Sequence, residues 1–273
     1  MIQNTWMEKR KHKYTAAAVS YLNTKPFLYG IFNTQMEEEV EIQLEIPSVC
    51  AKKLKEGTVD FGLVPVAIIP ELETPHIISD YCIGTVGAVK TVAIVSDVPI
   101  SEITDLYLDF HSRTSVQLAQ ILLREFWQHQ PKIHPAKEGF INQIGGTQAA
   151  VVIGDRCIGL DQIHKFYYDL GAAWLEFTGL PFVFATWVSN KPLPTEFIDR
   201  FNLAMQVGLE HIPQLIQLLP TPSTNFNLSA YFNQHISYPF DEPKKKALAR
   251  FLKYLNTDKM PMIQEGAQTR ILV

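Results

Sequence analysis

Short apolar runs that alternate with helix-start signals restrict the fold of this chain more than any other feature. Residues 13–20, 40–46 and 59–64 have strand-like patterns, and a helix-start signal that contains Pro follows each of the first two. A Pro in the first turn of a helix is typical of such starts. Strands separated by helices favour a mostly parallel sheet built from βα units. The sequence therefore predicts an α/β protein.

A second set of strands and a helical end complete the pattern. Further strands are expected at residues 89–96, 105–110, 149–154 and 182–189. Thr114 or Ser115 is expected to cap a helix that runs to about residue 128. From Pro194 onward the chain is expected to be helical, over residues 195–211, 213–219, 228–235 and 241–256. Two βα halves followed by a helical return predict a two-lobed, periplasmic-binding-protein-like (type II) α/β fold.

The two long strands suggest where the chain passes between the lobes. Strands 89–96 and 182–189 are expected to be the crossings. Lobe one then comprises residues 1–90 and 187–273, and lobe two comprises residues 91–186. A single doubly wound domain is the alternative.

Composition narrows the possible partners. The net charge of −4 offers no general attraction for nucleic acid. Neither a secretory signal nor a membrane-length apolar run is recognisable, so we expect a cytoplasmic protein that binds no membrane. The three cysteines form no CxxC pair, and the histidines form no HxxxH or HExxH pair. The sequence therefore predicts buried thiols, no metal site and no cofactor.

Polar residues follow the expected strands at the edge where open α/β sheets bind ligands. Their structural alternatives are helix capping for Ser48, Thr114, Ser115 and Asp155, a turn for Asn23, and a tight connection for Thr85. Uncharged side chains and helix N-termini on both lobes predict a small anionic ligand between the lobes. The candidate site residues are Ser20, Tyr21, Asn23, Ser48, Thr85, Thr114, Ser115 and Asp155.

Several of these residues lie in longer motifs. SYLNTKPF, CIGTVGAVKTVAIVS, LDFHSRTSVQLAQILL and GDRCI begin at residues 20, 82, 108 and 154, and similar motifs cover residues 47–67 and 169–187. In this order they resemble the chorismate dehydratases of the futalosine route to menaquinone. The resemblance covers residues 14–220.

The resemblance implies loss of water from chorismate, which gives 3-(1-carboxyvinyloxy)benzoate. Because the product ring is aromatic, the reaction has a large driving force and needs neither a metal nor a redox cofactor. Asn23 is expected to contact the reacting region, and Asp155 to be an acid, a base or a hydrogen-bonding group of the cleft. Ser20, Tyr21, Ser48, Thr85, Thr114 and Ser115 are expected to bind the substrate. The family commonly has Ser at position 85, so Thr85 keeps the hydroxyl and adds a methyl group.

Two other functions remain open. One is a sister enzyme like 1,4-dihydroxy-6-naphthoate synthase, whose first loop resembles SPCPND rather than SYLNTKP. The other is a non-catalytic cytoplasmic solute-binding protein. The only expected partner is a small dianionic substrate, chorismate. A monomer and a homodimer are both compatible with the sequence.

Overall fold

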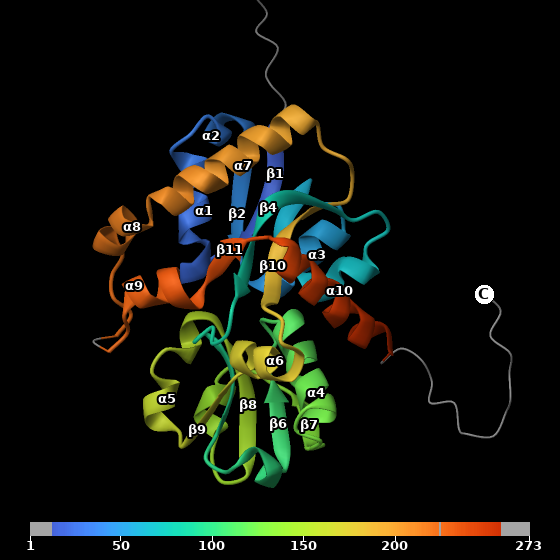
Figure 1. Cartoon of the computed structure of the whole chain (residues 1–273), viewed down its shortest axis with the longest axis vertical. Coiled ribbons are helices and arrows are strands. Elements are labelled where there is room, and N and C mark those ends of the chain that lie inside the picture. The colour runs from blue at the N-terminus through green and yellow to red at the C-terminus, as the bar shows by residue number, and fades with distance from the viewer. Residues whose placement is uncertain (1–12, 224, 258–273) are drawn as a thin grey trace, which may run out of the picture.

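The computed structural model describes residues 13–223 and 225–257, which form two lobes, each with its own sheet (Figure 1). The sheet of the first lobe has the order β11-β4-β10-β3-β1-β2. Its strands are β1 (Tyr14–Val19), β2 (Val40–Glu45), β3 (Phe61–Pro65), β4 (His76–Thr85), β10 (Phe182–Ser189) and β11 (Ser237–Pro239). The sheet of the second lobe has the order β7-β6-β8-β5-β9. Its strands are β5 (Val92–Ser96), β6 (Asp105–Leu108), β7 (Lys132–Pro135), β8 (Gln148–Ile153) and β9 (Phe166–Asp169).

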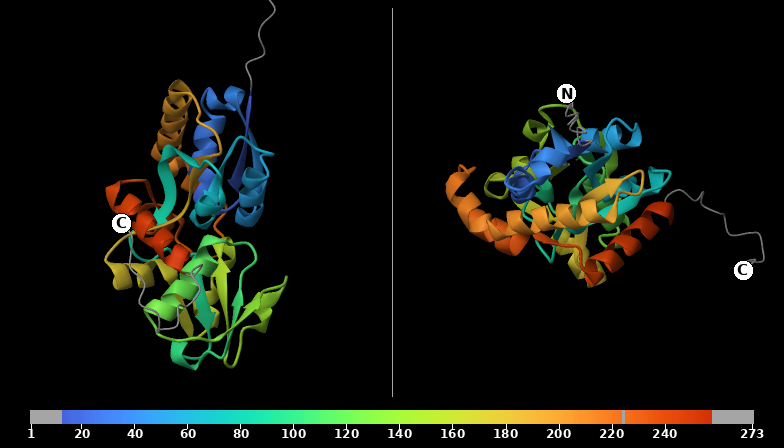
Figure 2. Two further views of the ribbon diagram at one scale, coloured as in Figure 1. Left: turned by 90° about the vertical axis from the view of Figure 1, so that its right-hand side faces the viewer. Right: turned by 90° about the horizontal axis from the view of Figure 1, so that it is seen from above.

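Helices cover both sheets. Those of the first lobe are α1 (Lys25–Phe32), α2 (Met36–Glu39), α3 (Pro47–Lys55), α7 (Thr195–Glu210), α8 (Ile212–Leu218), α9 (Leu228–Ala230) and α10 (Glu242–Thr257). Those of the second lobe are α4 (Thr114–Glu125), α5 (Leu160–Ile163) and α6 (Leu170–Thr178). The long helix α7 (amber) lies along one face of the first lobe, on the left in the left-hand view of Figure 2. The predicted two-lobed α/β architecture is confirmed.

Two glycines allow α1 and α7 to touch through their backbones. A Cβ atom on Gly30 would overlap the carbonyl oxygen of Ala204, and one on Gly208 would overlap that of Pro26. No larger residue fits at either position without moving a helix. This contact fixes α1, and with it the loop after β1.

The strand β10 corrects the expected crossings. It pairs antiparallel with β3 and β4 over residues 182–189, so the whole strand belongs to the first lobe's sheet. β5 likewise lies entirely in the other sheet. The prediction that these two strands cross between the lobes is wrong. The chain crosses in the short segments 86–91 and 179–181, and residues 182–186 lie in the first lobe's sheet.

A side chain of the second lobe fixes the first crossing segment. Asp169 caps α6 by accepting hydrogen bonds from the N–H groups of Gly171 and Ala172, at 2.9 and 3.0 Å. The same carboxylate accepts from the N–H groups of Val89 (3.1 Å) and Lys90 (2.7 Å). One carboxylate therefore fixes both α6 and the first crossing segment.

The larger of two apolar core clusters includes residues of both lobes, and the smaller one lies in the second lobe. Trp174 of α6 packs edge-on against Phe182 of β10 and lies 6.3 Å from the ring of Phe251 on α10. This packing fastens α10 across the lobe boundary (Figure 1). All three cysteines are buried free thiols, as the sequence predicts. Among the residues described, no helix is long and apolar enough to cross a membrane.

Candidate functional site

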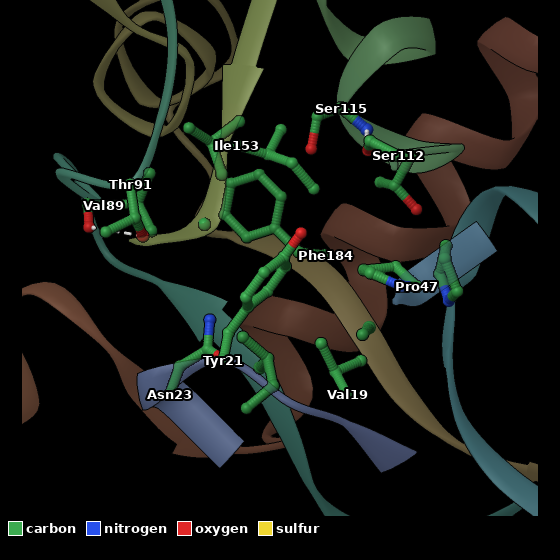
Figure 3. Close-up of a pocket in the computed structure, with 16 residues that line it drawn as sticks. Val19, Tyr21, Asn23, Pro47, Val89, Thr91, Ser112, Ser115, Ile153 and Phe184 are labelled. Atoms are coloured by element: carbon green, nitrogen blue, oxygen red, sulfur yellow. Dashed lines mark hydrogen bonds between the residues drawn. The ribbon is translucent and has the colours of Figure 1, made fainter. Parts of the chain in front are cut away.

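A cavity lies between the lobes, with a volume of about 530 Å³ that includes its solvent-open part (Figure 3). The described residues that line it carry no formal charge. They come from the loop after β1, the first crossing segment with the start of β5, the starts of α3 and α4, the end of β8 and the inner strands of the first sheet. The lining residues are Val19, Tyr21, Asn23, Pro47, Pro65, Ile83, Val89, Thr91, Val92, Ser112, Thr114, Ser115, Ile153, Gly154, Phe184 and Ala185.

Four candidate residues line this cavity together: Tyr21, Asn23, Thr114 and Ser115. Tyr21 and Asn23 follow β1 in the first lobe, whereas Thr114 and Ser115 begin α4 in the second. The rule that ligands bind beyond the carboxyl ends of strands therefore selected residues that meet across the cleft.

Asn23 is held by three neighbours. Its carbonyl oxygen accepts a hydrogen bond from the hydroxyl of Tyr238 (3.0 Å), and its side-chain oxygen accepts one from Thr24 (3.3 Å). Burial raises the pKa of Tyr231, while side-chain hydrogen bonds with Thr91 and Asn23 oppose that rise. The Asn23 amide nitrogen points into the cavity in Figure 3. A fixed neutral donor therefore faces the space where a ligand would lie.

The start of α4 provides further donors. Ser112, just before this helix, accepts the N–H of Ser115 on its Oγ at 2.9 Å. The expected capping by Thr114 or Ser115 is wrong, because α4 begins at Thr114 and Arg113 occupies the cap position. The Thr114 hydroxyl oxygen instead accepts the N–H of Ala67 across the lobe boundary (3.2 Å). The N-terminus of a helix attracts anions, so α4 favours a carboxylate at this end of the cavity.

Tyr21 belongs to a group of titratable residues between the lobes. Its hydroxyl lies 2.9 Å from Nδ1 of His111. Burial raises the pKa of Tyr21 to about 12, although the nearby Arg156 guanidinium opposes the shift. Burial and the charge of Arg156 lower the pKa of His111, and Asp109 opposes them. Tyr21 is therefore a neutral phenol, and the neutral form of His111 is favoured.

Two further candidates lie beside the cavity but not among its lining residues. Asp155 accepts hydrogen bonds from the backbone N–H of Leu22, at 3.3 Å to each carboxylate oxygen. Burial raises the pKa of this carboxyl group, and the bond from Leu22 opposes the rise. The N–H of Ser48 donates to the carbonyl oxygen of His111 (3.1 Å). Both residues thus connect the lobes.

The remaining two candidates have structural contacts. The N–H of Ser20 donates to the carbonyl oxygen of Glu45 (3.1 Å). Thr85 is fully buried, and its hydroxyl donates to the carbonyl oxygen of Gly87 (3.0 Å). Its methyl group lies against Gly171, where a Cβ atom would be only 2.7 Å away. The missing side chain at Gly171 makes room for the methyl group that Thr85 adds.

Several lining or supporting residues were not selected from the sequence. Thr91, Ser112 and Gly154 line the cavity, and His111 contacts Tyr21. His111, Ser112 and Gly154 lie in loops at the carboxyl ends of expected strands, where ligands are expected to bind. The sequence pattern does not show which side chains of such a loop face the cavity. Thr91 lies in the first crossing segment, which was expected to be part of a strand.

The two lobes with a cavity between them define a periplasmic-binding-protein-like fold. A solved structure of a protein from Archaeoglobus fulgidus has a TM-score of 0.71 at 14% identity, covering 90% of this chain and 98% of that one. A Candida albicans protein described as having the generic periplasmic binding protein fold gives 0.63 at 11%, covering 91% and 92%. The periplasmic aliphatic sulphonate binding protein of Escherichia coli gives 0.55 at 13%, covering 96% of each.

A comparison with protein families is more specific than the fold. A family model described as menaquinone biosynthesis matches residues 14–257, so the chain belongs to this family. Among curated relatives, the chorismate dehydratase of Thermus thermophilus is 22% identical over 241 residues, which cover 80% of this chain and 87% of that protein.

Proposed function

We propose that this protein is a chorismate dehydratase of menaquinone biosynthesis. Family membership and the Thermus thermophilus relative support this function. The observation that carries it is the cavity itself, which has uncharged hydrogen-bonding side chains from both lobes and the N-terminus of α4 at one side. Such a lining suits a small dianion that must be held by placed donors.

The reaction removes a ring proton and then a hydroxyl group. When the C–H bond breaks, its electron pair is delocalised toward the ring carboxylate. The neighbouring hydroxyl then leaves and takes up the proton that was removed from the ring, so that one water is released and the ring becomes aromatic. The protein has to bind two carboxylates, orient the ring and stabilise the charge that develops.

The lining residues divide these tasks between the lobes. Asn23 donates a hydrogen bond to the reacting region, and the start of α4 with Ser112, Thr114 and Ser115 holds a carboxylate. No carboxylate or imidazole lies among the described residues that line the cavity. The side-chain carboxylate of the substrate is therefore the proposed proton acceptor, and Asp155 the proposed interlobe contact. We place the reaction in the cytoplasm, with no resident cofactor, and a monomer or homodimer would serve it equally.

One assay separates the candidate functions. Purified protein is incubated with chorismate, without metal or nucleotide, and products are separated by chromatography. Formation of 3-(1-carboxyvinyloxy)benzoate supports the proposal. A parallel incubation contains a cyclic futalosine derivative, the substrate of the sister enzyme, and its conversion would identify that enzyme. Binding of chorismate without turnover of either compound would identify a solute-binding protein.

A pair of variants tests the site. Asn23→Ala removes the amide that points into the cavity and should lower kcat by about 100-fold or more, the scale seen when a single placed donor is lost. Asn33→Ala is the matched control, because Asn33 is exposed just after α1 and its side-chain amide donates to the carbonyl oxygen of Tyr29 in that helix. Equal activity in the two variants would remove Asn23 from the site.

A further inference from the structure

The loop after β1 reaches across the cavity and contacts the second lobe. The Tyr21 hydroxyl lies 2.9 Å from Nδ1 of His111, and the N–H of Leu22 donates to Asp155. Between these two contacts, the Tyr21 ring lies against Gly154 at the end of β8. Three contacts from two consecutive residues therefore join the lobes beside the ligand cavity.

The packing of the Tyr21 ring against the backbone at position 154 requires glycine there. A Cβ atom there would lie 2.7, 2.8 and 2.9 Å from three carbons of the ring, whereas ordinary van der Waals contact begins at 3.4 Å. Gly154 also has a φ of +66°, a conformation that other residues rarely adopt. Any side chain at this position would displace the Tyr21 ring.

A single buried carboxylate organises the side of the second lobe that receives Tyr21. Asp109 accepts hydrogen bonds from the N–H groups of His111 (3.0 Å) and Ile153 (3.1 Å). It also pairs with Arg156 at 2.5 Å, and its side chain is fully buried. Asp109 therefore fixes both the backbone of His111 and the end of β8 that leads to Gly154.

Tyr21 also lines the cavity, so the contact between the lobes and the ligand share one side chain. Its hydroxyl points toward the side on which Ser112 and Ser115 lie (Figure 3). A neutral histidine with its proton on Nδ1 donates to the phenol oxygen and leaves the phenol O–H free to donate elsewhere. The free O–H can then bind a carboxylate of the ligand.

We propose that Gly154 and His111 are positioning residues, which hold Tyr21 across the cleft so that its hydroxyl donates to a ligand carboxylate. This inference rests on the proposed function for the identity of the ligand. The packing of Tyr21 on Gly154 does not depend on that function. Closure and recognition of the anion are thereby coupled, because the hydroxyl reaches its place only when the ring lies on Gly154.

The test compares two glycine variants. Gly154→Ala adds a methyl group under the Tyr21 ring, whereas Gly57→Ala adds one at the matched φ of +68° with no atom within 4 Å. Gly154→Ala should lower kcat/KM for chorismate by about 100-fold, because the ring has to move by about 1 Å. It should also raise the pKa of His111 toward the ordinary value of 6.5. This pKa is measured by NMR titration, and the His111 signal is assigned by its absence in His111→Gln. Gly57→Ala should change neither quantity.

A change of background shows whether the effect passes through Tyr21. In Tyr21→Ala protein the ring is absent, so Gly154→Ala should cost no more than Gly57→Ala. Equal costs of Gly154→Ala in both backgrounds would overturn the proposal. An unchanged kcat/KM together with an unchanged His111 pKa in Gly154→Ala would also overturn the proposal. In another outcome, the protein turns over no chorismate while Gly154→Ala still shifts the His111 pKa as expected. That result would support the packing of Tyr21 on Gly154 and would contradict the proposed function.

Tyr21→Phe gives an independent test if Gly154→Ala does not fold. Phenylalanine keeps the ring on Gly154 and removes only the hydroxyl. Loss of a hydrogen bond to a carboxylate should raise KM by about tenfold or more, while the variant still folds because the ring keeps its packing. An unchanged KM would show that the hydroxyl does not contact the ligand and would contradict the proposal.

Discussion

Asp169→Ala should destabilise the protein far more than the loss of an ordinary helix cap. Its carboxylate accepts four backbone N–H groups, two at the start of α6 and two in the first crossing segment. Loss of the cap costs about 1 kcal/mol. The two N–H groups of Val89 and Lys90 lose a charged acceptor, at about 1 kcal/mol each for a partly buried site. The expected sum is about 3 kcal/mol.

Urea unfolding and thermal melting measure this cost. For a chain of this size, about 3 kcal/mol corresponds to a fall in Tm of about 6–12 °C. Asn227→Ala is the matched control, because the Asn227 side chain caps α9 through the N–H of Ala230 (2.9 Å) and has no crossing segment to hold. It should cost about 1 kcal/mol. If the two variants are equally destabilised, Asp169 is only a helix cap and the reasoning is refuted.

Two further predictions concern pH and packing. Because burial raises the pKa of Asp155 above 3.8, its contribution to stability is full at acid pH and is lost as the pH rises through the folded pKa. The stability of Asp155→Asn relative to wild type should therefore increase from acid to neutral pH in urea unfolding, and a decrease would contradict the raised pKa. Gly30→Ala should cost about 3 kcal/mol or more, because the added methyl group meets the α7 backbone. In the same assay Gly145→Ala, whose nearest neighbour would be 4.0 Å away, should cost clearly less, and equal costs would show that α1 and α7 can move apart freely.

The sequence predicted the parts of the fold that have clear periodicity. The β1 and β8 strands and the helices α4, α7 and α10 lie close to their expected positions. The strands β4, β7 and β9 and the helix α6 were not predicted. The alternation of β4 is broken by Asp80 and Tyr81, and both β9 and β7 have only four residues. A strand such as β10 shows the same apolar pattern whether it stays in one sheet or leads to another, so its pairing was not predictable.

The site was predicted at the level of loops rather than side chains. Strand ends identified the segments that carry Tyr21, Asn23, Thr114 and Ser115, all of which line the cavity. The direction of a side chain within a loop depends on tertiary contacts that the sequence does not show. Asp169 is different, because an Asp before Leu-Gly-Ala-Ala is a recognisable N-cap and could have revealed the start of α6.

The most direct test of the central claim is the product formed from chorismate. Mass spectrometry of the reaction should show a compound lighter than chorismate by one water, with the carboxyvinyl ether still attached to an aromatic ring. Its formation should require folded protein and should fall sharply in Asn23→Ala. Chorismate recovered unchanged from folded protein, or a product that has lost the carboxyvinyl group, would contradict the account.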